Sequence, residues 1–199
     1  MKSLSNEIIR CFIAIELGDQ ALKQVIVFQN VLTDAGADLK LVEAKNIHIT
    51  LRFLGEIPLK LSNKISEELT SIQFSPFEVS IQGTGVFPDL QHINVIWVGI
   101  ERGIVELTTL HNQIGSKLEK LDIHSDNRGF SPHVTVARVR SARNKDKVAK
   151  IVLNTHNEEF GIFPVDSIKL KKSILTPQGP VYTTLAEARA IGQPSSVPK

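Results

Sequence analysis

The sequence predicts an α+β protein in which sheets rich in antiparallel strands are covered by helices. Strand-like and helical runs follow one another in the order βαββαββαβαββ, which is not the strict βαβ alternation of a parallel sheet. A His-x-Thr-x pattern occurs twice, at His48–Leu51 and at His133–Val136, each time inside a strand-like run. No segment has the composition of a domain linker. We therefore expect residues 1–191 to form a single domain with two lobes, followed by a loose tail at 192–199.

The first half of the chain alternates β-favouring runs with amphipathic ones. The run Arg10–Leu17 is mostly apolar and β-favouring, which indicates a strand. Asp19 then offers an N-cap to a run whose apolar residues recur at helical spacing, and Gly36 ends that run. The predicted elements are a strand at 10–17, a helix at 19–36, a short extended piece near 41–42, a strand at 46–54 and a helix at 61–72.

The second half is interpreted by the same rules. The run Ile93–Ile100 is nearly all apolar, which is typical of a central strand covered on both faces. The run Ile104–Leu121 has the clearest helical spacing in the chain. The predicted elements are a strand at 77–81, a loop at 83–89, a strand at 93–100, a helix at 104–121, a loop at 126–132, a strand at 133–139, a basic stretch at 138–150 that leads into a helix ending near 153, and strands at 165–175 and 182–185.

Composition excludes several classes of protein. The formal net charge is only +2, so contact with nucleic acid must come from a local patch rather than from overall charge. Cys11 is the only cysteine, which excludes an internal disulfide and a multi-cysteine zinc site and fits a reducing compartment. No run approaches the roughly 18 apolar residues of a membrane span, and the apolar run at 11–15 is too short for a signal peptide. We expect a soluble, cytoplasmic protein.

The repeated motif is the feature around which a function can be predicted. Side chains alternate along a strand, so His48 and Thr50 should share one face, as should His133 and Thr135. A single His-x-Thr is most often structural. Two copies with apolar residues in both x positions favour a shared site, although an internal duplication in which His and Thr pair for stability is the alternative.

An imidazole and a hydroxyl from each of two strands suit acid–base chemistry on a phosphate. Hydrolysis of a cyclic phosphodiester needs a base to activate water and an acid to protonate the departing ribose oxygen, and each proton transfer contributes roughly 10²–10⁴-fold in rate. Threonine hydroxyls can stabilise the non-bridging oxygens. A zinc site at His48 and His133 is the rival interpretation, but the motifs supply no nearby third ligand. We therefore expect neither metal nor cofactor.

Other side chains are weaker candidates. Arg138 is a candidate phosphate ligand, but strict alternation places it on the wrong face, so a bulge or strand end is required. Arg52 alternates onto the same face as the first motif. Phe130 and Tyr182 are candidates to stack on a nucleobase, with a place in the core or at the rim as the alternative. The remaining histidines, including His111, are interpreted as structural or surface residues.

On these residues the chain resembles the two-histidine phosphoesterase superfamily. Within it, the chain is most similar to the RNA 2′,3′-cyclic phosphodiesterases of bacteria and archaea, historically also called 2′–5′ RNA ligases. The segments that carry the resemblance are Arg10–Ile15, Asn46–Leu51, Phe53–Gly55, Gly85–Phe87, Ser131–Arg138, Ser173–Leu175 and Gly179–Tyr182.

The resemblance implies a bilobal fold with pseudo-two-fold symmetry and both motifs in a central cleft. It implies that His48 donates a proton to the leaving oxygen and His133 accepts one from water, while Thr50, Thr135 and Arg138 hold the phosphate. The implied reaction opens a 2′,3′-cyclic phosphate at an RNA end, such as that of a tRNA fragment, to a 2′-phosphomonoester without metal. The reverse reaction would join RNA ends through a 2′–5′ bond. We expect a monomer.

Two alternatives stay open at this point. A relative of this class acting on a small cyclic or 2′–5′ nucleotide would carry the same motifs, because substrate length is set by the walls and rim of the site. A module that binds RNA ends without turnover is the other alternative, but a pure binder does not need an acid–base pair.

Overall fold

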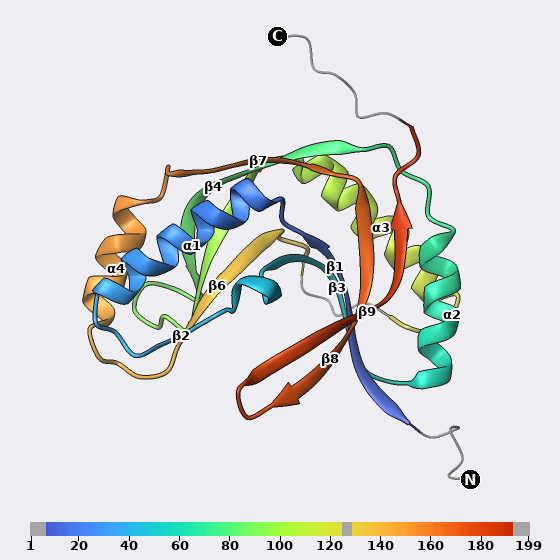
Figure 1. The fold of residues 1–199 in the computed structure, drawn as a ribbon, viewed down its shortest axis with the longest axis horizontal. Helices are drawn as coiled ribbons and strands as arrows, with labels where there is room; N and C mark the ends of the chain where they lie inside the picture. Colours follow the sequence, from blue (N-terminus) through green and yellow to red (C-terminus); the bar gives the residue numbers. More distant parts are fainter. Residues whose placement is uncertain (1–6, 125–128, 193–199) are drawn as a thin grey trace.

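One antiparallel sheet forms the framework of the protein. The computed structural model describes residues 7–124 and 129–192, and within them it contains a nine-stranded sheet and four α-helices (Figure 1). The elements are β1 (Ile8–Glu16), α1 (Asp19–Asp34), β2 (Leu39–Leu41), a 3₁₀ turn (Ala44–Asn46), β3 (His48–Pro58), α2 (Leu59–Thr70), β4 (Phe77–Phe87), β5 (Val95–Arg102), α3 (Ile104–Glu119), β6 (His133–Val139), α4 (Lys145–Asn154), β7 (Glu159–Val165), β8 (Ser167–Thr176) and β9 (Gly179–Arg189). Part of the expected loop at 126–132 and nearly all of the expected tail lie outside the described residues.

The sheet consists of two halves that meet at the motif strands. Its strand order is β7-β4-β5-β6-β3-β1-β8-β9, and β2 pairs with β6 beside this path. The halves therefore contain four strands each, with β6 and β3 at the junction. The register between these two strands pairs Ile49 with Val134, and β2 then continues along the later part of β6.

Two of the four helices, α1 and α3, are exchanged between the halves. Helix α1 follows β1 in the chain but packs on β7, β6 and α4, over the other half. Helix α3 follows β5 but packs on β3 and α2. In Figure 1, α1 and α4 lie together over one half, and α2 and α3 lie together over the other. None of the helices in the described part of the chain is long and apolar enough to cross a membrane.

A continuous hydrophobic core lies between the helices and one face of the sheet. At the junction it includes Ile49, Leu51, Val134 and Val136, each at most 1% exposed. These apolar residues occupy the x positions of the two motifs, so burying them turns the motif histidines and threonines to the opposite face. We call that opposite face, which the helices do not cover, the open face.

The largest differences between prediction and structure concern β5, β4 and β7. Strand β5 lies inside the sheet, but its residues alternate between buried and partly exposed because helices cover only one face. The expected loop at 83–89 is largely strand, since β4 continues to Phe87. Strand β7 was not predicted, because Gly161 and Pro164 interrupt its pattern and argue against a strand.

Candidate active site

The two motifs lie on adjacent strands. Because Ile49 pairs with Val134 in an antiparallel register, the register places His48 beside Thr135 and Thr50 beside His133. Both apolar partners are fully buried on the helix side. Two imidazoles and two hydroxyls that are far apart in the chain thus come together on the open face.

The imidazole of His48 is held in one orientation. Its Nδ1 donates to the backbone oxygen of Asn46 at 2.7 Å, so in the neutral ring the unprotonated Nε2 accepts from the Thr50 hydroxyl at 3.0 Å. The Asn46 side chain is itself buried and donates to the backbone oxygen of Pro180 at 2.8 Å. The start of β9 therefore fixes the residue that orients His48.

Aromatic rings enclose the His48 ring. Phe12 stacks on it with ring centroids 4.8 Å apart, and Tyr182 presents its edge at 5.6 Å. Tyr182 also meets Phe12 edge-on at 4.8 Å. Burial raises the pKa of Tyr182, and the charges of Arg138 and Arg10 oppose this rise. Tyr182, a candidate from the sequence, thus lies directly beside the first motif.

The environment of His48 disfavours its charged form. Burial lowers its pKa below the usual 6.5, and the positive charges of Lys171 and His133 lower it further. The hydrogen bond to Asn46 and the charge of Glu16 oppose this shift but do not reverse it. The ring is therefore mostly neutral at pH 7 when no anion is bound.

His133 repeats the geometry of His48. Its Nδ1 donates to the backbone oxygen of Ser131 at 2.8 Å, again two residues upstream, so its Nε2 is the free nitrogen of the neutral ring. Phe87 presents its edge at 5.0 Å and Trp97 lies at 6.3 Å. Both motif histidines therefore combine an anchored Nδ1 with aromatic neighbours.

A β-bulge follows the first motif and changes which residues reach the open face. Strand β1 pairs Ala14 with Thr50 and Ile13 with Arg52, which leaves Leu51 as the extra residue. The alternation therefore reverses after Leu51. Arg52 is only 7% exposed, so the expectation that it shares the face of His48 is wrong. Arg52 turns to the buried side because of the bulge at Leu51, which no residue pattern in the sequence indicates.

A bulge at the matching position follows the second motif. Strand β5 pairs Trp97 with Thr135 and Ile96 with Ala137, which leaves Val136 as the extra residue. The next residue but one, Arg138, is exposed and returns to the face of the motif. This is the irregularity that a phosphate-binding Arg138 requires. Its charge also acts on Tyr182 across the junction.

The symmetry of the bulges identifies a residue that the sequence reasoning missed. Phe53 stands five residues after His48, as Arg138 stands five residues after His133. Phe53 is 71% exposed, and its ring centroid lies 6.5 Å from that of Phe12. Comparing the two motifs position by position, beyond the four residues of each, would have found it.

Phe130 packs in a different place from Tyr182. Its ring stacks on His111 of α3 with centroids 4.2 Å apart and an interplanar angle of 15°. His111 in turn donates from Nδ1 to the backbone oxygen of Leu51 at 2.8 Å, on the helix side of the sheet. Phe130 is thus a packing partner of α3, and His111 is tied to the first motif strand.

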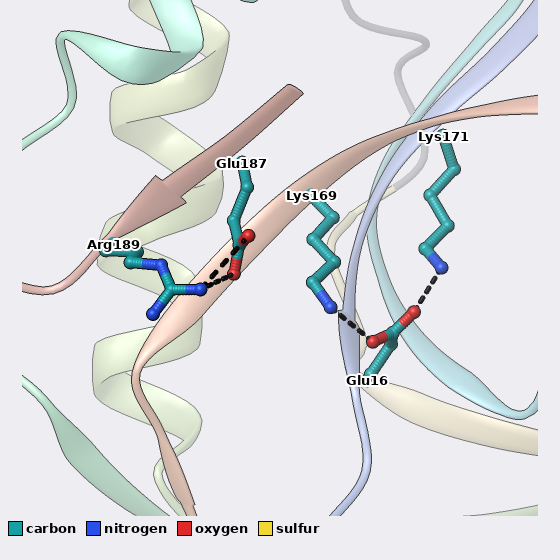
Figure 2. A network of polar contacts seen from close by, with 5 residues as sticks. All are labelled: Glu16, Lys169, Lys171, Glu187 and Arg189. Atoms are coloured by element: carbon teal, nitrogen blue, oxygen red, sulfur yellow. Dashed lines mark hydrogen bonds and ion pairs between the residues drawn. The ribbon is translucent and has the colours of Figure 1, made fainter. Parts of the chain in front are cut away.

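A charged cluster extends the open face beyond His48. Glu16, opposite His48 in the register, hydrogen-bonds both Lys169 and Lys171, as Figure 2 shows. Burial alone would raise the pKa of Glu16, but the two lysines lower it overall. Lys171 is only 7% exposed. Two cations against one carboxylate leave a net positive charge near the first motif, which the sequence did not reveal.

Binding of a metal ion requires several ligating side chains close together. Within residues 7–124 and 129–192, no three side chains of His, Cys, Asp or Glu come close enough together to hold one.

Comparison with known proteins agrees with this geometry. The curled antiparallel sheet with its four helices is the fold of LigT-type two-histidine phosphoesterases. The chain belongs to the 2′-5′ RNA ligase superfamily, whose family model matches residues 28–173. It is 39% identical over 159 residues to an RNA 2′,3′-cyclic phosphodiesterase of Aeropyrum pernix, covering 80% of this chain and 90% of that protein. It is 40% identical over 177 residues to one of Archaeoglobus fulgidus, covering 88% and 97%.

Solved structures share the fold. A protein of Thermus thermophilus superposes with a TM-score of 0.76 at 26% identity, covering 90% of this chain and 97% of its own. Escherichia coli LigT complexed with 3′-AMP has a TM-score of 0.76 at 23% identity, covering 94% and 100%. Together these comparisons make the protein an enzyme of the cyclic phosphodiesterase type.

Proposed function

We propose that this enzyme hydrolyses 2′,3′-cyclic phosphate ends of RNA to 2′-phosphomonoesters, without a metal ion. One observation carries the proposal. His48 and His133 lie on adjacent strands, and each donates from Nδ1 to a backbone oxygen two residues upstream. Each ring therefore keeps Nε2 for proton transfer at the open face. The relatives that bear this activity in their names support the same reaction.

In the proposed reaction His133 is the proton acceptor and His48 the proton donor. Nε2 of His133 takes a proton from water as the water oxygen bonds to phosphorus. The bond from phosphorus to the ribose 3′ oxygen breaks, and protonated Nε2 of His48 supplies the proton to that oxygen. The anionic phosphate raises the pKa of His48 on binding, which offsets the effect of burial. The joining of RNA ends through a 2′–5′ bond would be the reverse of this chemistry in the same site.

The phosphate is held by groups around the junction. Thr50 and Thr135 place hydroxyls on the open face beside the two imidazoles. Arg138, turned to this face by its bulge, supplies a guanidinium that suits two phosphate oxygens at once. These groups stabilise the charge that develops on the non-bridging oxygens.

The nucleoside lies on the His48 side. The leaving 3′ oxygen belongs to the terminal ribose, so that ribose and its base must lie near the proton donor. Phe53, exposed on this side, offers a face on which the base can stack, with Tyr182 nearby. The positive charge of Lys169 and Lys171 suits the backbone of an RNA chain.

The test is an assay of purified protein in EDTA with an oligonucleotide that ends in a 2′,3′-cyclic phosphate. We expect release of the 2′-phosphomonoester, and faster turnover than with the corresponding cyclic mononucleotide. Activity that disappears in EDTA and returns with zinc or magnesium would contradict a metal-free site. Tight binding of the oligonucleotide without any product would favour a binding module, and a preference for the mononucleotide would favour a small-nucleotide substrate.

A further inference from the structure

Both bulges beside the motifs are held by a side chain from the helix layer. In β6, the buried side chain of Gln29 from α1 donates to the backbone oxygen of Val136 at 2.8 Å. Its amide also donates to the backbone oxygen of Val42 at 2.8 Å. In β3, His111 from α3 donates to the backbone oxygen of Leu51 at 2.8 Å.

The two contacts are equivalent under the pseudo-symmetry of the fold. Val136 and Leu51 are the extra residues of the two bulges, and each stands three residues after its motif histidine. The donors come from the two exchanged helices, each of which follows a strand of the half that does not contain the bulge. Gln29 and His111 are different residue types, so neither the motif nor a repeat in the sequence points to them.

We propose that Gln29 and His111 are positioning residues that set Arg138 and Phe53 in the active site by fixing the two bulges. This inference rests on the proposed function, which gives those two residues their roles. A bulge interrupts the regular ladder, and a side-chain donor to its carbonyl stabilises it against the regular register. In β6 that carbonyl, of Val136, also accepts from the backbone amide of Val42 at 2.9 Å, so Gln29 is its second donor. In the regular register Ala137 would face the site and Arg138 would turn away from it.

His111 has a second contact that strengthens its assignment. The same ring that bonds to Leu51 stacks on Phe130, which precedes the second motif in the chain. One side chain of α3 thus touches both the strand of His48 and the segment that leads to His133. The stack on Phe130 therefore helps to hold the His111 ring where its Nδ1 meets the backbone oxygen of Leu51.

For Gln29 the test is a double-mutant cycle. Gln29→Met keeps the length of the side chain but removes both hydrogen bonds. We expect kcat/KM to fall on the order of ten- to a hundred-fold, as misplacement of a binding group does, but less than about two-fold when Arg138→Ala is already present. Val25→Ala, also fully buried on α1, is the matched control and should lower stability without this coupling. Equal losses in both backgrounds would overturn the proposal for Gln29.

For His111 the test compares a variant that removes the hydrogen-bond donor with one that replaces it. His111→Leu should raise KM, with little further effect when Phe53→Ala is present. His111→Gln, which copies the donor used at the other bulge, should keep most of the activity that leucine loses. If glutamine and leucine were equally damaging, or if the leucine effect added fully to that of Phe53→Ala, His111 would be only a packing residue.

A structural measurement separates failure of this inference from failure of the proposed function. Backbone amide chemical shifts of residues 134–138 report the bulge whether or not the enzyme turns over a cyclic phosphate. We expect Gln29→Met to shift these amides strongly and Val25→Ala to leave them nearly unchanged. Unchanged amides in Gln29→Met would overturn the inference, even if the reaction itself is confirmed.

Discussion

At the scale of single residues, the two motif histidines are alike in geometry but differ in surroundings. Each is anchored through Nδ1 to a backbone oxygen. His48 is additionally buried under Phe12 and Tyr182 and lies within the field of Lys171. A proposed proton donor with a lowered pKa acts efficiently only once the substrate phosphate is bound, so binding and protonation are coupled.

This difference predicts a titration. The pKa of His48 should lie below 6.5 in the free protein and rise when inorganic phosphate or the product binds. The unfolded chain protonates His48 at a higher pH than the folded protein does. The neutral His48 ring therefore contributes its full share of folding stability above pH 6.5, and this contribution is lost as the pH falls through the pKa of the folded protein. NMR titration of the imidazole measures the pKa, and His48→Gln should flatten the pH dependence of unfolding. A pKa above 6.5 in the free protein would contradict the account.

Phe53 gives a prediction for substrate binding. Phe53→Ala should raise KM for a cyclic-phosphate oligonucleotide on the order of ten- to a hundred-fold, because stacking on one base contributes about 1–3 kcal/mol. Phe53→Trp should retain the binding. The control is Val105→Ala, which removes a 75% exposed apolar side chain from α3 and should change nothing. Steady-state kinetics that left KM unchanged in Phe53→Ala would remove Phe53 from the site.

At the scale of secondary-structure elements, the sequence predicts those features that depend only on residues near one another in the chain. The His-Thr alternation is predictable because no bulge falls between the histidine and the threonine of either motif. The face of Arg52 cannot be predicted from local alternation, because the bulge at Leu51 depends on pairing with β1 and on a donor from α3. Neither interaction leaves a local pattern in the sequence. The pairing of β3 with β6 is likewise non-local. It could be inferred from the repeated motif but not from either strand alone.

Strand β4 carries a prediction about packing beside the second motif. A Cβ at Gly85 would lie 2.1 Å from Cζ2 of Trp97, so Gly85→Ala must displace the indole ring that neighbours His133. We expect a loss of about 1–3 kcal/mol in the free energy of unfolding and a shift in the fluorescence of this single tryptophan. Gly115→Ala in α3 meets nothing within 4 Å and should instead stabilise the protein by up to about 1 kcal/mol. A Gly85→Ala protein with unchanged fluorescence and stability would show that the ring is not held there.

At the scale of the whole molecule, the exchanged helices join the two halves into one structure. Helix α1 follows β1 of the β3 half but covers the β6 half, and α3 follows β5 of the β6 half but covers the β3 half. One hydrophobic cluster includes residues from both halves. The proposed active site lies where the halves meet, so its geometry depends on the contact between them.

This arrangement predicts cooperative unfolding. Ile65→Val, in α2 over the β3 half, should lower the free energy of unfolding by about 0.5–1.5 kcal/mol and move the transition seen through Trp97 in the other half by the same amount as that seen by far-UV circular dichroism. Val152→Ala in α4 is the reciprocal variant. Two separate transitions, or a Trp97 transition that does not move in Ile65→Val, would mean that the halves unfold independently.

We propose that the two motif histidines share one reaction. The measurement that tests this is hydrolysis of a cyclic-phosphate-ended oligonucleotide by the wild type, His48→Ala and His133→Ala under identical conditions. We expect that the wild type releases the 2′-phosphomonoester and that each variant loses at least about 10²-fold in rate while staying folded. Near-wild-type turnover by either variant would contradict it.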